Sequence, residues 1–153
     1  MVRVDRASKE IAASPGAVYA ALVDPAALVE WLPPQGMTGR FEHFDARPGG
    51  SFRLVLTYDD PSAAQGKSTA DSDVSEARFT DLVPGERVVQ EIDFVSDDPA
   101  FAGTMTMTWT VAPAEGGATV EVAASGVPDG IRPEDHAEGM GSSLDNLAAY
   151  LAR

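Results

Sequence analysis

One histidine and one aspartate in this sequence are spaced so that the aspartate could orient the histidine as a general base. His43 and Asp45 lie two residues apart in an alternating segment, so both would project from the same face of a strand. A carboxylate can orient an imidazole as a proton acceptor, and the hydroxyl of Tyr58 could then donate to a developing oxyanion. Phe41 shares the parity of His43, whereas Phe44 favours the opposite orientation. The pair can act on a ligand only in the first orientation.

The remaining polar residues are typical of a solvated surface. His136 stands among acidic residues at the start of the last predicted helix. The acidic clusters at residues 59–60, 71–73 and 97–98 lack the spacing of a calcium loop, and no His-x-x-x-His pair occurs. The sequence has no cysteine, no glycine-rich phosphate loop and no Gly-x-Ser-x-Gly motif. We therefore expect no metal and no cofactor.

Bulky apolar side chains recur at every second position in the middle of the chain. In GTMTMTWTV, residues 103–111, the threonines take one parity and the apolar residues the other, so one face of a strand is apolar. These side chains would either fill a core at ordinary density or surround a pocket for a small apolar or aromatic molecule. The predicted ligand-binding set, with the first member at the lip of the pocket, is Trp31, Phe52, Leu54, Leu56, Tyr58, Met105, Met107, Trp109, Met140 and Leu144.

The pattern predicts helices at both ends of the chain. Ser14-Pro15 and Asp24-Pro25 are typical helix starts, and they predict short helices over residues 15–23 and 24–32. A long helix is expected after Pro133, because acidic residues occupy its first turn and apolar residues follow at steps of three and four. That apolar stripe comprises Ala137, Met140, Leu144, Leu147 and Leu151.

Between the helices the apolar period is close to two, which predicts antiparallel strands. One strand is expected before Ser14, and six more at residues 38–46, 51–59, 73–83, 87–96, 103–112 and 118–126. The polar loop from Pro61 to Asp71 is expected to be the most mobile segment. This order of strands and helices predicts a fold of the α+β class, in which the last helix packs on one face of an antiparallel sheet.

Length and charge limit the function classes. The 153 residues suit one domain, 1–153, and the formal net charge of −13 without any basic run argues against binding to nucleic acid or to a membrane surface. No stretch approaches about 18 apolar residues, and the N-terminus is charged where a signal peptide would be apolar. We expect a cytoplasmic protein, and its alanine, glycine, aspartate and arginine content is typical of a GC-rich bacterial genome.

The chain resembles the START-like (SRPBCC) superfamily, which includes the birch pollen allergen, and within it the bacterial homologues of the heat-shock-protein-90 ATPase activator. The resemblance implies a helix-grip fold, in which a curved antiparallel sheet wraps around the C-terminal helix and an apolar cavity lies between them. Many relatives have Trp where this chain has Met140. The matching segments are Ser14-Pro15-x-x-Val18-Tyr19-x-Ala21-Leu22, Asp24-Pro25…Trp31, Asp45-x-Arg47-x-Gly49-Gly50-x-Phe52, Phe79-x-x-Leu82-Val83-Pro84-x-Glu86-Arg87-Val88-Val89, Met105–Trp109 and Gly139…Leu144…Leu147.

Three functions are consistent with these observations. The first is non-catalytic binding of a small hydrophobic or aromatic ligand between the sheet and the last helix. The second, which rests on the resemblance alone, is a chaperone-interacting module. The third is an enzyme of the polyketide-cyclase sort that uses His43 and Asp45. An open sheet also has edge strands through which a homodimer could form.

Overall fold

A seven-stranded antiparallel sheet forms the body of the protein in the computed structural model, which describes residues 3–60, 62, 69 and 71–153. The strand order is β1-β7-β6-β5-β4-β3-β2, so the edges of this sheet are β1 and β2. The elements are β1 (Val4–Ile11), α1 (Pro15–Leu22), α2 (Pro25–Trp31), β2 (Met37–Phe44), β3 (Ser51–Tyr58), β4 (Ser72–Val83), β5 (Arg87–Phe94), a 3-10 turn (Pro99–Phe101), β6 (Thr104–Ala114), β7 (Gly117–Ser125) and α3 (Pro133–Leu151).

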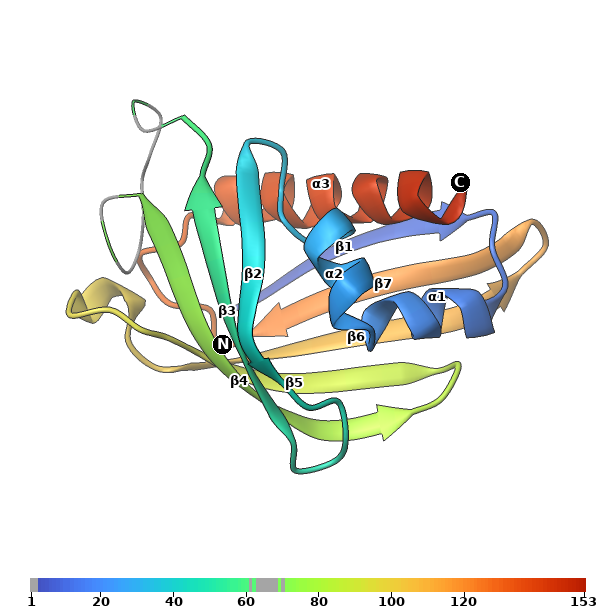
Figure 1. Ribbon diagram of the computed structural model, residues 1–153, viewed down its shortest axis with the longest axis horizontal. Helices are drawn as coiled ribbons and strands as arrows, with labels where there is room; N and C mark the ends of the chain where they lie inside the picture. Colours follow the sequence, from blue (N-terminus) through green and yellow to red (C-terminus); the bar gives the residue numbers. More distant parts are fainter. Residues whose placement is uncertain (1–2, 61, 63–68, 70) are drawn as a thin grey trace.

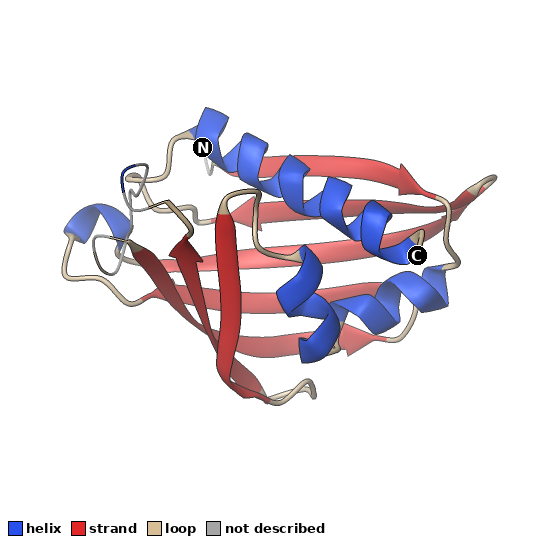
Figure 2. Cartoon of the chain, turned by 45° about the horizontal axis from the view of Figure 1, so that its top comes forward, coloured by secondary structure: helices blue, strands red, loops and turns tan. Residues whose placement is uncertain are grey.

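The sheet curves around α3. In Figure 1, β2, β3 and β4 turn out of the plane of the other strands, and in Figure 2 α3 runs across the concave face with α1 and α2 beside its C-terminal half. α3 contacts β1 on one side and α2 on the other. The helix-grip fold of the α+β class predicted from the sequence is therefore confirmed.

The two short helices begin where their capping residues predict. The Ser14 hydroxyl accepts a hydrogen bond from the Ala17 amide at 3.1 Å, and the Asp24 carboxylate accepts one from the Ala26 amide at 3.0 Å. Each bond satisfies an amide that has no partner within the helix. The ends of the strands differ by up to two residues from the predicted ends, and most of the predicted mobile loop, Pro61–Asp71, lies outside the described residues.

The apolar stripe of α3 is narrower at its start than the sequence indicates. Met140, Leu144 and Leu147 are buried as predicted, but Ala137 is exposed. The buried face also includes Ser143, whose hydroxyl donates to the Leu32 carbonyl oxygen at 2.6 Å. Close to it, the Asn146 side-chain amide donates to the Pro33 carbonyl oxygen at 3.0 Å. These bonds hold α3 against the end of α2, where the helix carbonyls lack internal partners.

Candidate ligand-binding site

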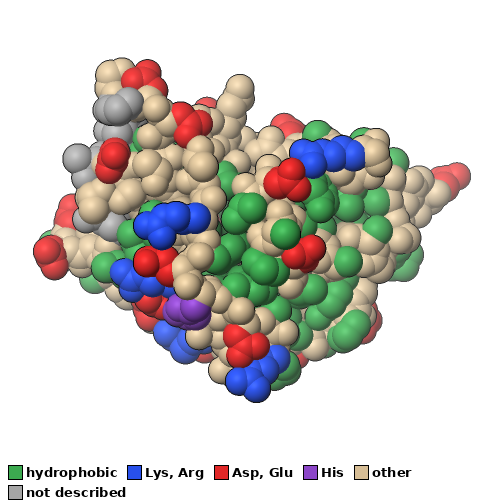
Figure 3. All heavy atoms as spheres, viewed as in Figure 1, with side chains coloured by type: hydrophobic (Ala, Val, Ile, Leu, Met, Phe, Trp, Pro, Cys, Tyr) green, Lys and Arg blue, Asp and Glu red, His purple; other side chains and the backbone are tan. Residues whose placement is uncertain are grey.

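A cavity of about 870 Å³ lies between the concave face of the sheet and the helices α2 and α3. It is within the size range of known small-molecule pockets, about 300–1,000 Å³. Gln35, Asp135 and Glu138 line it and are exposed, so the mouth lies between the first turns of α3 and the segment before β2. On the face shown in Figure 3, hydrophobic side chains gather around α1 and α2, with charged side chains around them.

The pairing of the strands brings apolar side chains together on the face of the sheet that lines this cavity. In the ladder between β5 and β6, Ile92 lies opposite Met105 and Val88 opposite Trp109, so these side chains share one face. β3 presents Phe52 and its alternate neighbours to the same side. Of the ten residues predicted as ligand-binding, all except Leu144 line the cavity: Trp31, Phe52, Leu54, Leu56, Tyr58, Met105, Met107, Trp109 and Met140. Leu144 is buried in the core instead, with 1% of its surface exposed. That these residues contact a ligand stays a prediction.

Trp31 lies deeper than predicted. It has no exposed surface, so its expected position at the lip is wrong, although it does line the cavity. Its indole nitrogen donates to the Ala21 carbonyl oxygen at 3.0 Å, and its ring meets Trp109 edge-on with centroids 5.5 Å apart. The hydrogen bond turns the polar edge of the indole towards α1 and leaves its apolar surface for the cavity.

Four phenylalanines close the end of the apolar interior near the turn between β2 and β3. Phe41, Phe44, Phe52 and Phe79 form successive ring contacts with centroid distances between 4.9 and 5.8 Å. Phe41 and Phe44 both take part even though they lie three residues apart on one strand. A register shift between Phe41 and His43 makes this arrangement possible, because a β-bulge reverses the facing of the residues beyond it.

The same bulge removes His43 and Asp45 from the cavity. Both side chains are exposed, and neither lines the cavity. His43 Nε2 lies 3.2 Å from the Ser51 hydroxyl, and the Asp45 carboxylate forms an ion pair with Arg47 at 2.7 Å. The alternative in which His43 and Asp45 act as a general base requires both side chains to face the cavity, and neither does, because the strand does not keep a single parity.

A different carboxylate and histidine meet at the start of α3. His136 Nδ1 lies 2.7 Å from Asp5 Oδ2, and the guanidinium of Arg3 donates to both Asp5 oxygens, at 2.8 and 3.0 Å. His136 is not a solvated side chain as expected, because only 14% of its side chain is exposed and it lines the cavity. The hydrogen bond from Arg3 lowers the pKa of Asp5 from its ordinary value; burial opposes this effect and the hydrogen bond from His136 adds to it.

Sequence reasoning missed this group because Asp5 and His136 are 131 positions apart. The available signal was the parity of β1, on which Asp5 and Lys9 share the inward face with Ala7 and Ile11. Charged residues on the inward face of an edge strand require partners in the layer above. Both have them on α3, since Lys9 pairs with Asp145 at 3.1 Å.

Polar side chains interrupt the apolar wall at a few positions. Tyr58, Asp73, Ser75 and Gln90 all line the cavity, and Asp73 and Gln90 are buried. Burial raises the pKa of Tyr58, and the negative charges of Asp73 and Asp135 raise it further. The Tyr58 hydroxyl therefore remains protonated near neutrality and can donate a hydrogen bond at the mouth. Ser75 and Gln90 were not singled out from the sequence.

The described part of the chain has neither a cluster of metal-ligating side chains nor a membrane-spanning helix. No group of three or more histidine, cysteine, aspartate or glutamate side chains there could hold a metal ion. Among the described helices, none is sufficiently long and apolar to span a bilayer.

The curved sheet, the C-terminal helix and the apolar cavity between them define the START-like (SRPBCC) superfamily. Within it, the family described as Activator of Hsp90 ATPase homolog 1-like protein matches residues 12–152, and the chain belongs to this family. A comparison with curated proteins finds no significant match.

Solved structures agree with this assignment. Protein CV1439 from Chromobacterium violaceum is 33% identical over 98% of this chain and 97% of its own, with a TM-score of 0.86. The AHSA1 protein from Silicibacter pomeroyi is 24% identical over 98% of both chains, with a TM-score of 0.79. A protein from Arthrobacter aurescens is 17% identical over 99% of this chain and 91% of its own, with a TM-score of 0.80. The last two show a shared fold.

Proposed function

We propose that this protein binds a small, mainly apolar or aromatic molecule in the cavity between the sheet and α3 and releases it unchanged. The observation that carries the proposal is the cavity itself, of about 870 Å³, whose wall is built from one face of β3, β5 and β6. A core filled by its own side chains would leave few voids larger than a water molecule.

The composition of the wall suits an adaptable apolar site. Met105 and Met107 have unbranched, polarisable side chains that can adjust to the shape of a ligand, and Trp109 offers an aromatic surface for stacking. Transfer of an apolar ligand into such a site is favourable by about 25 cal/mol per Å² of apolar surface removed from water.

The first experiment uses N-phenyl-1-naphthylamine, an uncharged probe whose fluorescence rises in apolar surroundings. Both tryptophans of the sequence, Trp31 and Trp109, line the cavity, so excitation of tryptophan should transfer energy to a bound probe. A probe present at 100 times its dissociation constant should also stabilise the fold by about 2.7 kcal/mol in a thermal melt. The probe should be recovered chemically unchanged.

Two neighbouring residues on β6 provide a matched pair of variants. Met107→Trp places a large ring into the cavity, whereas Thr108→Trp places the same ring on the opposite face of the strand. We expect Met107→Trp to weaken probe binding at least about tenfold and Thr108→Trp to leave it unchanged. Equal affinity in both variants, or no binding to the unmodified protein, would overturn the proposal.

The family description favours a second candidate, an interaction with an Hsp90-type chaperone. Its test is the ATPase rate of the chaperone from the same organism, measured with and without an excess of this protein. A rate increase that persists in Met107→Trp would assign the activity to the exterior of the protein, because that substitution changes the cavity and leaves the exterior unchanged. An unchanged rate would remove this candidate and leave ligand binding unaffected.

A further inference from the structure

One buried polar side chain on the cavity wall has no hydrogen-bond partner among the described residues. Gln90 lies on the concave face of β5 between the buried residues Val88 and Ile92, and only 8% of its surface is exposed. Its neighbours across the ladders are Phe79 on β4 and Met107 on β6. The amide therefore stands in the middle of an apolar wall, where a hydrogen-bonding group is costly unless it is paired.

The amide of Gln90 makes no side-chain hydrogen bond in the described part of the chain. In the same part, no fully buried side-chain nitrogen or oxygen lacks a partner. The amide nitrogen and oxygen of Gln90 must therefore reach accessible space, and the accessible space beside this residue is the cavity. An amide can donate and accept at once, so it matches a hydroxyl or an amide of a ligand equally well.

The charges around the cavity oppose an anionic ligand. The described lining residues include the carboxylates of Asp73, Asp135, Glu138 and Asp145 but no lysine or arginine. Burial is the main cause of the raised pKa of Tyr58, which also lines the cavity, and the negative charges of Asp73 and Asp135 raise it further. His136 is the one basic side chain among the described lining residues, and it is engaged by Asp5.

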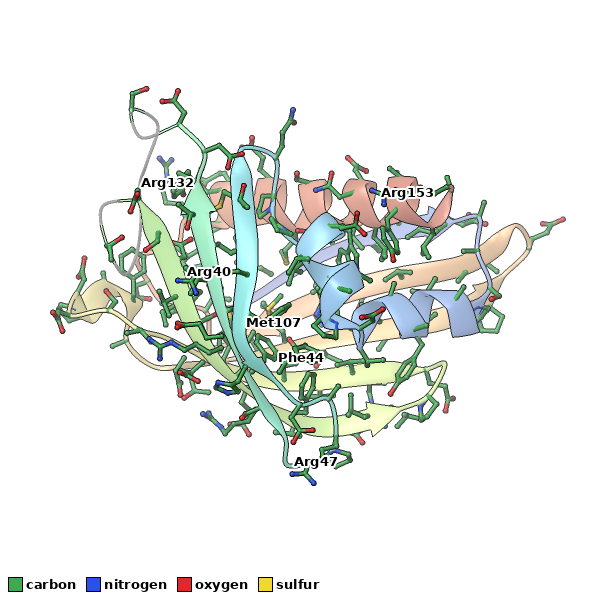
Figure 4. The ribbon with its side chains drawn as sticks, in the orientation of Figure 1. Arg40, Phe44, Arg47, Met107, Arg132 and Arg153 are labelled. Atoms are coloured by element: carbon green, nitrogen blue, oxygen red, sulfur yellow. The ribbon has the colours of Figure 1, made fainter. Side chains whose placement is uncertain are left out.

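None of the arginines labelled in Figure 4 lines the cavity. Arg47 is at the outer tip of the turn between β2 and β3, and Arg132 and Arg153 flank the two ends of α3, whereas Met107 lies inside the curve of the sheet. A carboxylate or sulfonate that entered the cavity would lose its hydration without gaining a described cationic partner there.

We infer that the ligand is an uncharged, mainly apolar molecule that carries one hydroxyl or amide group and places this group against Gln90. The inference rests on the proposed binding function and adds the chemical class of the ligand. The apolar body would lie against Met105, Met107 and Trp109, and the polar group would form a hydrogen bond with the Gln90 amide.

Three probes with the same ring system separate these features. 2-Naphthol has a hydroxyl, naphthalene has no polar group, and 2-naphthoate has a negative charge. Each is titrated into isotopically labelled protein and followed by NMR, where the side-chain amide signals of Gln90 report on contact. We expect 2-naphthol to shift those signals and to bind about tenfold more tightly than naphthalene, as one added hydrogen bond predicts, and 2-naphthoate to bind more weakly than 2-naphthol.

Gln90→Leu tests the role of the amide, and Thr108→Val is its control because it removes a polar group from the outer face of the neighbouring strand. Gln90→Leu should abolish the preference for 2-naphthol over naphthalene while retaining naphthalene binding, and Thr108→Val should keep the preference. Equal binding of 2-naphthol and naphthalene to the unmodified protein, or a preference for 2-naphthoate, would overturn the inference and leave the proposed function standing. Failure of all three probes to bind would count against both.

Discussion

His136 Nδ1 and Asp5 Oδ2 lie 2.7 Å apart and join the first turn of α3 to β1. Arg3 donates to the same carboxylate, so the nearly buried charge of Asp5 has two partners, the Arg3 guanidinium and the His136 ring. Removing one member of such a cluster lowers the unfolding free energy more than removing one member of an exposed ion pair does. The reason is that the remaining members stay buried without their partner. The contact fixes the end of α3 that borders the mouth of the cavity.

Asp5→Asn should therefore destabilise the protein. The substitution keeps the shape of the side chain but removes the charge that Arg3 and His136 share, and we expect a loss of about 2 kcal/mol in the free energy of unfolding. Chemical denaturation near neutral pH measures this loss. Asp145→Asn is the matched control on the same interface, because Asp145 is 71% exposed in its pair with Lys9, and it should cost less than about 1 kcal/mol. Equal losses in the two variants would contradict the argument.

The contribution of Asp5 should disappear in acid. Because folding lowers the pKa of this carboxyl below its ordinary 3.8, the folded protein binds the proton less readily than the unfolded chain. The stabilisation is complete above the unfolded-state pKa and is lost as the pH falls through the folded-state pKa. Unfolding free energies of the unmodified protein and Asp5→Asn should therefore differ near neutrality and converge as the pH falls below 3.8. A difference that stays constant across this range would rule out the carboxylate charge as its source.

Trp31 and Trp109 form a T-shaped pair, but their indole nitrogens differ in hydrogen bonding. Trp31 donates to the Ala21 carbonyl, which lies in the last turn of α1 where carbonyls lack helical partners. Trp31→Phe should leave that carbonyl unpaired and cost about 1–3 kcal/mol in unfolding free energy. Trp109→Phe makes the same change of ring, but no hydrogen bond from Trp109 is found in the described part of the chain, so it should cost less. Thermal and chemical denaturation of both variants provide the comparison, and a reversed order would contradict it.

Features set by local chemistry were predictable from the sequence. The caps at Ser14 and Asp24 are determined by hydrogen bonds within three residues, and the facing of Phe52 and Trp109 follows from regular alternation along β3 and β6. The apolar wall of the cavity could be proposed for that reason. The depth of Trp31 could not, since it depends on how closely α2 packs on the sheet.

Features that depend on an irregularity or on distant contacts were not predictable. One bulge in β2 reverses the facing of His43, and alternation in the sequence cannot show where a bulge falls. Asp5 meets His136 only because the fold brings β1 beneath α3. The position of Gln90 on the inward face of β5 could be read from alternation, but the absence of a described partner for its amide could only come from the structure.

The bulge at Phe41–His43 leads to a last prediction, about the pair first considered for catalysis. Because His43 is exposed and outside the cavity, His43→Ala should change the affinity for N-phenyl-1-naphthylamine by less than about twofold and the unfolding free energy by less than about 0.5 kcal/mol. Fluorescence titration and chemical denaturation measure the two quantities. Phe41→Ala, two positions earlier on β2, removes a ring that lines the cavity and contacts Phe44 and Phe52. It should weaken probe binding and cost about 1–2 kcal/mol, since the ring is partly buried and its apolar contacts are lost. If His43→Ala weakened binding as strongly as Phe41→Ala, the strand would present His43 to the ligand and the position of the bulge would be wrong.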